Sequence, residues 1–328
     1  MKAIVQDTYG SPAVLRLEEI AKPVPNDGEV LVRIRAASLN ARDWHVMRGD
    51  PYVMRLTRND DLGRRAPKAR IRGTDFAGVV EEVGRAVTRF EAGDEVFGES
   101  RGAFAEYIAA PEEFVESKPA NLTFEQAAAL PTAGNTALVL LRDGGHVESG
   151  QHVLINGASG GVGTFGVQIA KSLGADVAAV VSTRNVDLVG MLGADRVIDY
   201  KQEDFVRNGH RYDVVVDLVG NRSLRDLLRA TTPAGTLVLS GGGVSNGGSV
   251  IGPMGLFISG LAAARFVRTR IVAPLASPGR EELATLKGLA ESRKITPIID
   301  RAYSLAEVPE AMRYVEGEHA RAKVVITV

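Results

Sequence analysis

Cysteine is absent from this chain of 328 residues, which can therefore form no disulfide bond and lacks the thiolate ligands of most structural zinc sites. The five histidines are scattered and form no spaced pair, so we expect no metal site. No uninterrupted apolar run approaches the about 18 residues of a membrane-spanning helix. The net charge of −1 offers no attraction to nucleic acid or to an anionic membrane. These absences leave a small molecule as the expected partner.

The length and the start of the chain set two further expectations. A chain of 328 residues is long enough for two domains. The first residues, Met1 to Asp7, contain no apolar core of the kind found in signal peptides, so we expect a cytoplasmic protein.

Residues 1–120 are predicted to form a β-rich domain. Short runs of β-branched or alternating apolar residues are separated by glycines, a pattern typical of a compact barrel or sandwich. The predicted strands are Ala3–Val5, Glu29–Ala37, Gly78–Val83, Asp94–Phe97 and Phe104–Ala109. Two helices, Pro278–Arg293 and Leu305–Glu316, and a final strand, Ala322–Val328, are predicted near the C-terminus. We expect residues 276–328 to complete this first domain.

A glycine-rich turn between two regular segments is the most informative motif. The apolar run His152–Asn156 ends at Gly157-Ala158-Ser159-Gly160-Gly161-Val162-Gly163, and a segment with helical spacing, Thr164–Gly174, follows. Glycines let the backbone approach a pyrophosphate, and the helix N-terminus offers it N–H groups and partial positive charge. The motif therefore predicts a dinucleotide-binding unit, with Gly157, Ser159, Gly160, Gly161, Val162 and Gly163 at the cofactor.

Apolar runs alternate with helical segments over residues 121–275. The later runs are Val177–Val181, Arg196–Asp199, Val214–Asp217, Thr236–Leu239 and Arg270–Ala273. This alternation predicts a doubly wound parallel α/β sheet, the Rossmann architecture. An apolar helix is also predicted at residues 254–267, either packed against a sheet or a partner copy or lining a substrate pocket.

Segments spread over nearly the whole chain carry a family resemblance. They are Ala37–Asn40 followed by Asp43, Gly73–Gly78, Phe90–Val96, Gly157–Gly163, Leu192–Asp195 before Val197–Tyr200, and Ala322–Val328. Together they resemble the medium-chain dehydrogenase/reductase superfamily, in its zinc-free quinone oxidoreductase-like branch. The resemblance implies a GroES-like catalytic domain joined to a Rossmann domain, with cofactor and substrate in the cleft between them, and a homodimer.

The resemblance also bears on zinc. Zinc-using relatives have a cysteine ligand where this chain has Asn40, and a His-Glu pair where it has Thr74 and Asp75. Their third cysteine ligand would fall near Ala128, and the four-cysteine structural lobe is missing. Without these ligands we expect no zinc chemistry.

The end of the second predicted Rossmann strand favours NADPH over NADH. NAD enzymes usually carry an acid there for the ribose 2′-hydroxyl, but this strand ends in Ser182-Thr183-Arg184, and no carboxylate follows before Asp187. The two hydroxyls can donate hydrogen bonds and Arg184 can fork onto a phosphate. By resemblance, Tyr200 also lies against the 2′-phosphate.

The residues that bind the nicotinamide end of the cofactor are less clearly indicated by the sequence. By resemblance, Asn40 and Thr136 lie near the nicotinamide or its ribose. Val219 and Ser240-Gly241 follow two parallel strands, so they are expected at the carboxyl edge of the sheet, where ligands bind.

The proposed chemistry follows from the missing metal. Reduction of a quinone or an α,β-unsaturated carbonyl needs hydride, a proton and hydrogen bonds to the developing oxyanion, and no Lewis acid. The resemblance implies that Asn40 positions the nicotinamide or the substrate oxygen, and that His45 or Tyr52 supplies the proton or an orienting hydrogen bond. Asp43 is a further candidate, with backbone capping as its alternative role. Two other functions stay open, namely a zinc-free alcohol or ketone dehydrogenase and a non-catalytic NADPH-binding sensor.

Overall fold

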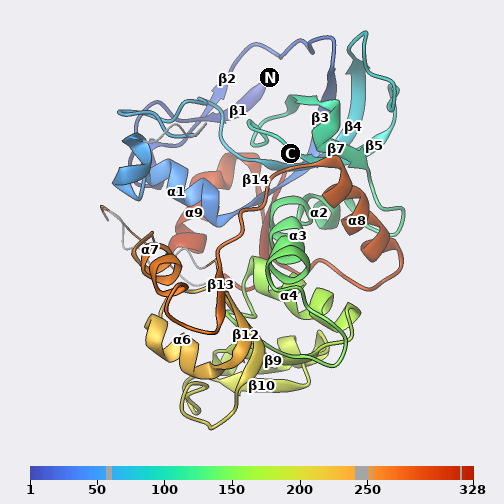
Figure 1. The fold of residues 1–328 in the computed structure, drawn as a ribbon. Coiled ribbons are helices and arrows are strands. Elements are labelled where there is room, and N and C mark those ends of the chain that lie inside the picture. Colours follow the sequence, from blue (N-terminus) through green and yellow to red (C-terminus); the bar gives the residue numbers. More distant parts are fainter. Residues whose placement is uncertain (57–60, 241–249, 251, 253, 318–319) are drawn as a thin grey trace. The chain divides into compact units, whose positions relative to one another are not determined.

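The computed structural model describes residues 1–56, 61–240, 250, 252, 254–317 and 320–328. The chain divides into two compact units, one made of Met1–Asn135 with Ser277–Val328 and the other of Thr136–Ala276 (Figure 1). Residues 121–135 group with the first unit in this division. The functional domain boundary at residues 120 and 121 stays a prediction.

The first unit is built on a mainly antiparallel sheet. Its described strands are β1 (Lys2–Val5), β2 (Arg16–Glu19), β3 (Glu29–Leu39), β4 (Asp75–Val83), β5 (Glu95–Glu99), β6 (Tyr107–Pro111), β7 (Val115–Ser117), β14 (Ile299–Ser304) and β15 (Lys323–Thr327). The largest sheet has the order β14-β15-β3-β4-β5-β7, and β6 also pairs with β3. The long strand β3 thus joins N-terminal and C-terminal parts of the chain.

Helices cover this sheet, and two of them carry candidate site residues. The helices are α1 (Ala41–Arg48), α2 (Phe124–Ala128), α8 (Arg280–Glu291) and α9 (Val308–Gly317), with a short 3-10 helix η2 (Tyr52–Leu56). Helix α3 (Pro131–Leu138) begins in the first unit and ends in the second. Helix α1 was not predicted from the sequence. It starts at Asn40, whose backbone N–H donates to Asp43 Oδ2 over 2.9 Å, while the Asp43 N–H donates to the backbone carbonyl oxygen of Asn40 over 3.0 Å. It buries Trp44 and Met47 in the core with Phe76 and Phe104.

The second unit is a parallel sheet with helices between the strands. It comprises β8 (His152–Asn156), α4 (Gly161–Ser172), β9 (Asp176–Val181), α5 (Val186–Met191), β10 (Arg196–Asp199), β11 (Tyr212–Asp217), α6 (Leu224–Ala230), β12 (Thr231–Leu239), α7 (Met254–Ala263) and β13 (Arg270–Val272) (Figure 1). The strand order is β10-β9-β8-β11-β12-β13. The order reverses between β8 and β11, which makes the carboxyl ends of these strands the expected ligand site.

The predicted α/β class with a doubly wound parallel sheet is therefore confirmed. Strand β10 has the predicted bounds, whereas β6 starts three residues later than the strand predicted from Phe104. The predicted apolar helix is observed as α7, which ends at Ala263 and packs against β13 and α6. Its Gly260 is buried beside Leu239 and Ile271, whereas Ile258 and Leu261 are exposed. No described helix is long and apolar enough to cross a membrane.

Candidate cofactor and active site

The glycine-rich turn after β8 forms a cradle that side chains would fill. Gly157 has φ +89°, and a Cβ there would lie 2.7 Å from Val219 Cγ2. A Cβ on Gly163 would lie 2.2 Å from the Gly157 carbonyl oxygen. Gly160 caps α4, whose first-turn N–H groups have no intrahelical acceptor. The turn therefore fits the pyrophosphate of a dinucleotide, which these N–H groups would hold.

A buried asparagine joins this turn to the end of β9. Asn185 Nδ2 donates to Ser159 Oγ over 2.9 Å and to Ser182 Oγ over 3.2 Å. Asn185 is 4% exposed, whereas both serines are half-buried. Sequence reasoning named the two serines and missed the side chain that holds them, because its role depends on the contact of two loops.

The end of β10 places a carboxylate, Asp199, beside the end of β9, which the sequence at the end of β9 did not predict. Thr183 Oγ1 donates to Asp199 Oδ2 over 2.7 Å, because Asp199 pairs with Val181 in the parallel register of β9 and β10. The Thr183 hydroxyl keeps the pKa of this exposed carboxyl below its usual value. The Thr183 proton is thus committed to Asp199 instead of an external phosphate. Tyr200 follows directly and is 52% exposed.

The ends of β8 and β11 meet in a second polar group. Asn156 Nδ2 donates to Asp217 Oδ1 over 2.8 Å, and this oxygen also accepts the N–H groups of Val219 and Gly220 at 3.2 Å each. The carboxylate shapes the turn that brings Val219 beside Gly157. Ser240, whose N–H donates to the Asp217 carbonyl, directly follows β12. Gly241 lies outside the described residues.

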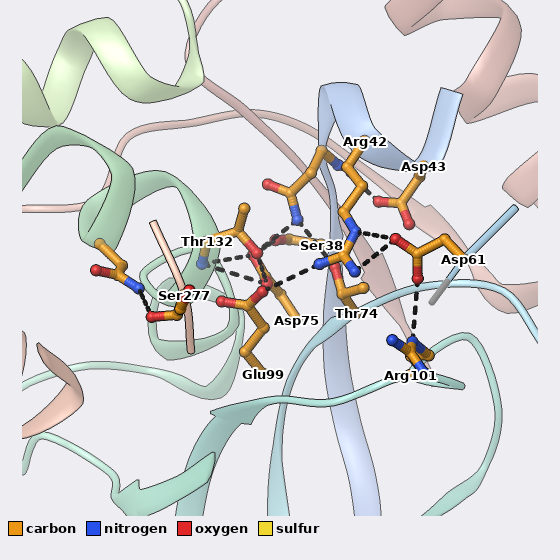
Figure 2. Close-up of polar contacts among 12 residues, drawn as sticks. Ser38, Arg42, Asp43, Asp61, Thr74, Asp75, Glu99, Arg101, Thr132 and Ser277 are labelled. Atoms are coloured by element: carbon orange, nitrogen blue, oxygen red, sulfur yellow. Dashed lines mark hydrogen bonds and ion pairs between the residues drawn. The ribbon is translucent and has the colours of Figure 1, made fainter. Parts of the chain in front are cut away.

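In the first unit, Asn40 contacts Thr74 and Asp75, which belong to the buried polar cluster drawn in close-up in Figure 2. Asn40 Nδ2 donates to Asp75 Oδ2 over 2.9 Å and more weakly to Thr74 Oγ1 over 3.4 Å. Asp75 is fully buried and also accepts hydrogen bonds from the Ser38 and Thr132 hydroxyls. Both amide protons of Asn40 are therefore committed to protein acceptors.

A buried lysine completes this cluster from the last strand. Lys323, at the start of β15, is 2% exposed, and its Nζ donates to Asn40 Oδ1 over 2.5 Å and to the Leu39 carbonyl over 2.9 Å. The same ammonium lies 3.6 Å from Asp75 Oδ2. Burial lowers the pKa of Lys323, and the facing carboxylates of Asp75 and Asp43 oppose that shift.

Two neighbouring carboxyls are hard to ionise. Burial and the Asp75 charge raise the pKa of Glu99 to about 7. Burial raises the pKa of Asp43 to about 6, against the opposing attraction of Arg72. Arg42 pairs with Asp61, which also accepts from Arg101, and its guanidinium lies 3.5 Å from Glu99 (Figure 2). No local sequence pattern indicates that these charged side chains are partners, because they come from distant segments.

The two predicted proton donors have different surroundings. The His45 Nδ1 atom lies 3.1 Å from the Asp50 carbonyl oxygen, and burial lowers the pKa of the imidazole. A carbonyl only accepts, so neutral His45 carries its proton on Nδ1 and offers Nε2 as an acceptor. Tyr52, in η2, is 41% exposed, and the Arg55 guanidinium lies 4.4 Å from its ring centre. Tyr52 makes no hydrogen bond with a described residue.

The remaining predicted residues fall on α2 and α3. Thr136 is half-buried on α3, one helical turn after Thr132. Ala128, near which the third cysteine ligand of zinc-using relatives would fall, is fully buried, and the side chain that this part of the chain brings to Asp75 is Thr132.

The residues present do not fit a zinc ion. The positions of the ligands in zinc-using relatives hold an amide, a hydroxyl and a carboxylate, and the Lys323 ammonium lies against two of them. A fixed positive charge repels a cation, and sulfur and imidazole donors are missing here. No group of three potential metal-binding side chains occurs among the residues that the structure describes.

The fold and these sites define a two-domain, dinucleotide-binding oxidoreductase. Residues 26–120 match the alcohol dehydrogenase GroES-like domain, and residues 192–326 match a family described as zinc-binding dehydrogenase. The chain is 36% identical over 341 residues to 2-methylene-furan-3-one reductase of Solanum lycopersicum, covering 99% of this chain and 79% of that protein. It is 33% identical to the chloroplastic NADPH-dependent alkenal/one oxidoreductase of Arabidopsis thaliana, with coverage of 99% and 79%.

Solved structures agree with this assignment. The Coxiella burnetii quinone oxidoreductase is 31% identical, with a TM-score of 0.84 and coverage of 100% of this chain and 99% of that one. The Escherichia coli quinone oxidoreductase complexed with NADPH is 26% identical, with a TM-score of 0.84 and full coverage of both chains. The chain belongs to the medium-chain dehydrogenase/reductase superfamily, among its quinone oxidoreductase-like members.

The buried Lys323 is expected to dominate the stability of the first unit. Lys323→Met leaves the Asp75 carboxylate buried without its cation and should lower the free energy of unfolding by about 3–5 kcal/mol. Lys287→Met, a control at a partly exposed lysine near Glu116, should cost no more than about 1 kcal/mol. Denaturant unfolding measures both, and equal losses would contradict the assignment. Adding Asp75→Asn to Lys323→Met should restore part of the loss.

Proposed function

We propose that this chain is an NADPH-dependent, zinc-independent reductase of quinones or α,β-unsaturated carbonyls. The observation that carries the proposal is the buried ammonium of Lys323 among Asn40, Thr74 and Asp75. This arrangement offers no Lewis acid, so the chemistry must proceed with hydride, a proton and hydrogen bonds. The named relatives reduce substrates of these kinds.

The cofactor supplies hydride when bound, and this chain's residues bind and orient it. The first turn of α4 and Ser159 would hold the pyrophosphate, and Ser182, Arg184 and Tyr200 the 2′-phosphate. An NADPH-dependent relative and an NADPH complex of another support this choice.

The hydrogen bonds of Asn40 suggest what it can contact. Both Nδ2 protons are committed, so Asn40 can offer an external group only the second lone pair of Oδ1. A substrate carbonyl oxygen needs a donor, whereas the carboxamide of nicotinamide contains one. Of the two alternatives, Asn40 therefore suits the orientation of nicotinamide.

The proton donor is proposed to be Tyr52. Neutral His45 presents an acceptor at Nε2 and suits an orienting role. Tyr52 has an exposed ring and an uncommitted hydroxyl, which can donate to an oxyanion. Hydride on the far carbon of an enone creates an enolate, and the proton completes the reduced product.

A homodimer and a cytoplasmic location remain predictions. The named alkenal/one oxidoreductase relative is chloroplastic. Sedimentation of the purified chain and localisation of the native protein would test these two points.

The reaction class is tested with a substrate panel. The purified protein should consume NADPH with a quinone or an enone, and incubation with a chelator should leave the rate unchanged. Elemental analysis should find no stoichiometric zinc. One zinc per chain that is lost together with activity would refute metal independence. Oxidation of simple alcohols without turnover of any quinone or enone would favour the dehydrogenase, and binding without any turnover would favour the sensor.

Cofactor preference is tested at Arg184. The wild type should bind NADPH at least about tenfold more tightly than NADH, a difference of about 1.4 kcal/mol. Arg184→Ala should lower the affinity for NADPH about tenfold and leave NADH nearly unchanged, since only NADPH carries the 2′-phosphate. Calorimetric titration measures both affinities, with Arg225→Ala on α6 as the control. Equal wild-type affinities would show that the preference was assigned incorrectly.

The proton donor is tested by two substitutions with little change in volume. Tyr52→Phe should lower kcat by about 10²-fold with NADPH affinity preserved, the usual range for a lost proton donor. His45→Gln should lower it by less than about tenfold, because its imidazole is assigned an orienting role. Tyr107→Phe, a tyrosine stacked against Lys22, is the matched control. If the kcat of Tyr52→Phe falls by no more than about threefold, water and not Tyr52 supplies the proton.

A further inference from the structure

Asn185 occupies a position where two parts of the cofactor-binding unit meet. Ser159 belongs to the glycine-rich turn before α4, and Ser182 directly follows β9. The Asn185 amide nitrogen bridges their hydroxyl oxygens at 2.9 and 3.2 Å. These three residues lie in one compact unit, so their geometry is independent of the other unit.

The direction of these hydrogen bonds decides where the serine protons point. An amide NH₂ has two protons, and Asn185 uses one on each serine, so both hydroxyl oxygens act as acceptors. Each hydroxyl retains its own proton, and neither donates to a residue that the structure describes. Both protons are therefore available to an acceptor outside the protein.

The adjacent threonine shows the opposite arrangement. Thr183 directs its hydroxyl proton to Asp199 Oδ2, over 2.7 Å. Three hydroxyls around the end of β9 are thus divided into two that can donate outward and one that cannot.

The carbonyl oxygen of the Asn185 side chain lacks a hydrogen-bond donor in the described part of the chain. This atom, Oδ1, is buried. Leaving a buried acceptor without a donor destabilises the folded chain. A buried polar atom without a partner therefore needs an explanation.

We propose that Asn185 is a positioning residue of the cofactor site, which turns the Ser159 and Ser182 hydroxyl protons toward the phosphates of NADPH. Ser159 then donates to the pyrophosphate, shared by both nicotinamide dinucleotides, and Ser182 to the 2′-phosphate, present only in NADPH. This assignment rests on the proposed NADPH-dependent function. It adds that Asn185 orients the two serine hydroxyls before the cofactor binds.

A double-mutant cycle tests the assignment by calorimetric titration with NADPH and NADH. Ser182→Ala should weaken the affinity for NADPH about tenfold, the range for a lost hydrogen bond to a charged group. The affinity for NADH should stay within about twofold of the wild-type value. Asn185→Ala should weaken the affinity for NADPH about tenfold or more. It should weaken the affinity for NADH about threefold, because the Ser159 hydroxyl also loses its orientation. The double variant should bind NADPH several-fold better than the product of the two effects predicts, because Asn185 acts through Ser182.

Two further variants separate orientation from folding. Asn185→Asp keeps the size but accepts hydrogen bonds, so it turns both serine protons inward, and NADPH should weaken more than in Asn185→Ala. Asn208→Ala, a control at an asparagine bonded to Glu203, should change neither affinity. Thermal unfolding of each variant verifies that it is folded.

The outcomes distinguish this inference from the proposed function. Independent, multiplicative effects of Asn185→Ala and Ser182→Ala on NADPH would overturn the positioning role while the wild type still bound NADPH. An Asn185→Ala variant with wild-type affinities would overturn it as well. A wild type that bound no NADPH would overturn the proposed function and this inference together.

Discussion

The buried ammonium of Lys323 holds together the region that carries the candidate chemistry. It contacts the end of β3 at Leu39, the cap of α1 at Asn40 and the fully buried Asp75 of β4. An ion of this kind is costly to bury alone, so its carboxylate partner and hydrogen-bond acceptors must stay in place. Strand β15, from which Lys323 comes, pairs with β3 itself. The last residues of the chain are therefore structural partners of a site formed near its beginning.

This arrangement gives a physical reason why these residues do not fit a zinc ion, although part of the chain matches a family described as zinc-binding dehydrogenase. At the positions where zinc-using relatives have their ligands, this chain has Asn40, Thr74 and Asp75. These side chains form hydrogen bonds with one another and contact the Lys323 ammonium. The cluster has its own positive charge, because the Lys323 ammonium lies 3.6 Å from Asp75 Oδ2. Glu99, the cross-strand neighbour of Asp75, is then the carboxyl that resists ionisation near neutral pH, as its raised pKa shows.

The dinucleotide-binding unit uses a different device, the orientation of neutral hydroxyls. Glycines let the turn after β8 fold tightly beside Val219, and the sheet reverses its strand order next to it. The side chains at the end of β9 then have their donors and acceptors set by Asn185 and Asp199. Affinity for an anion at such a place depends on which hydroxyl protons remain uncommitted.

The sequence by itself determined the α/β class, the glycine-rich turn and most strands of the parallel sheet, because these depend on short-range patterns of apolar residues and glycine. It also determined the absence of soft zinc ligands, which is a matter of composition. The partners of the site were decided only by the tertiary structure. Lys323 is separated from Asn40 by 283 residues, and Asp199 from Thr183 by 16. No local pattern encodes such contacts, since sheet pairing alone brings these side chains together.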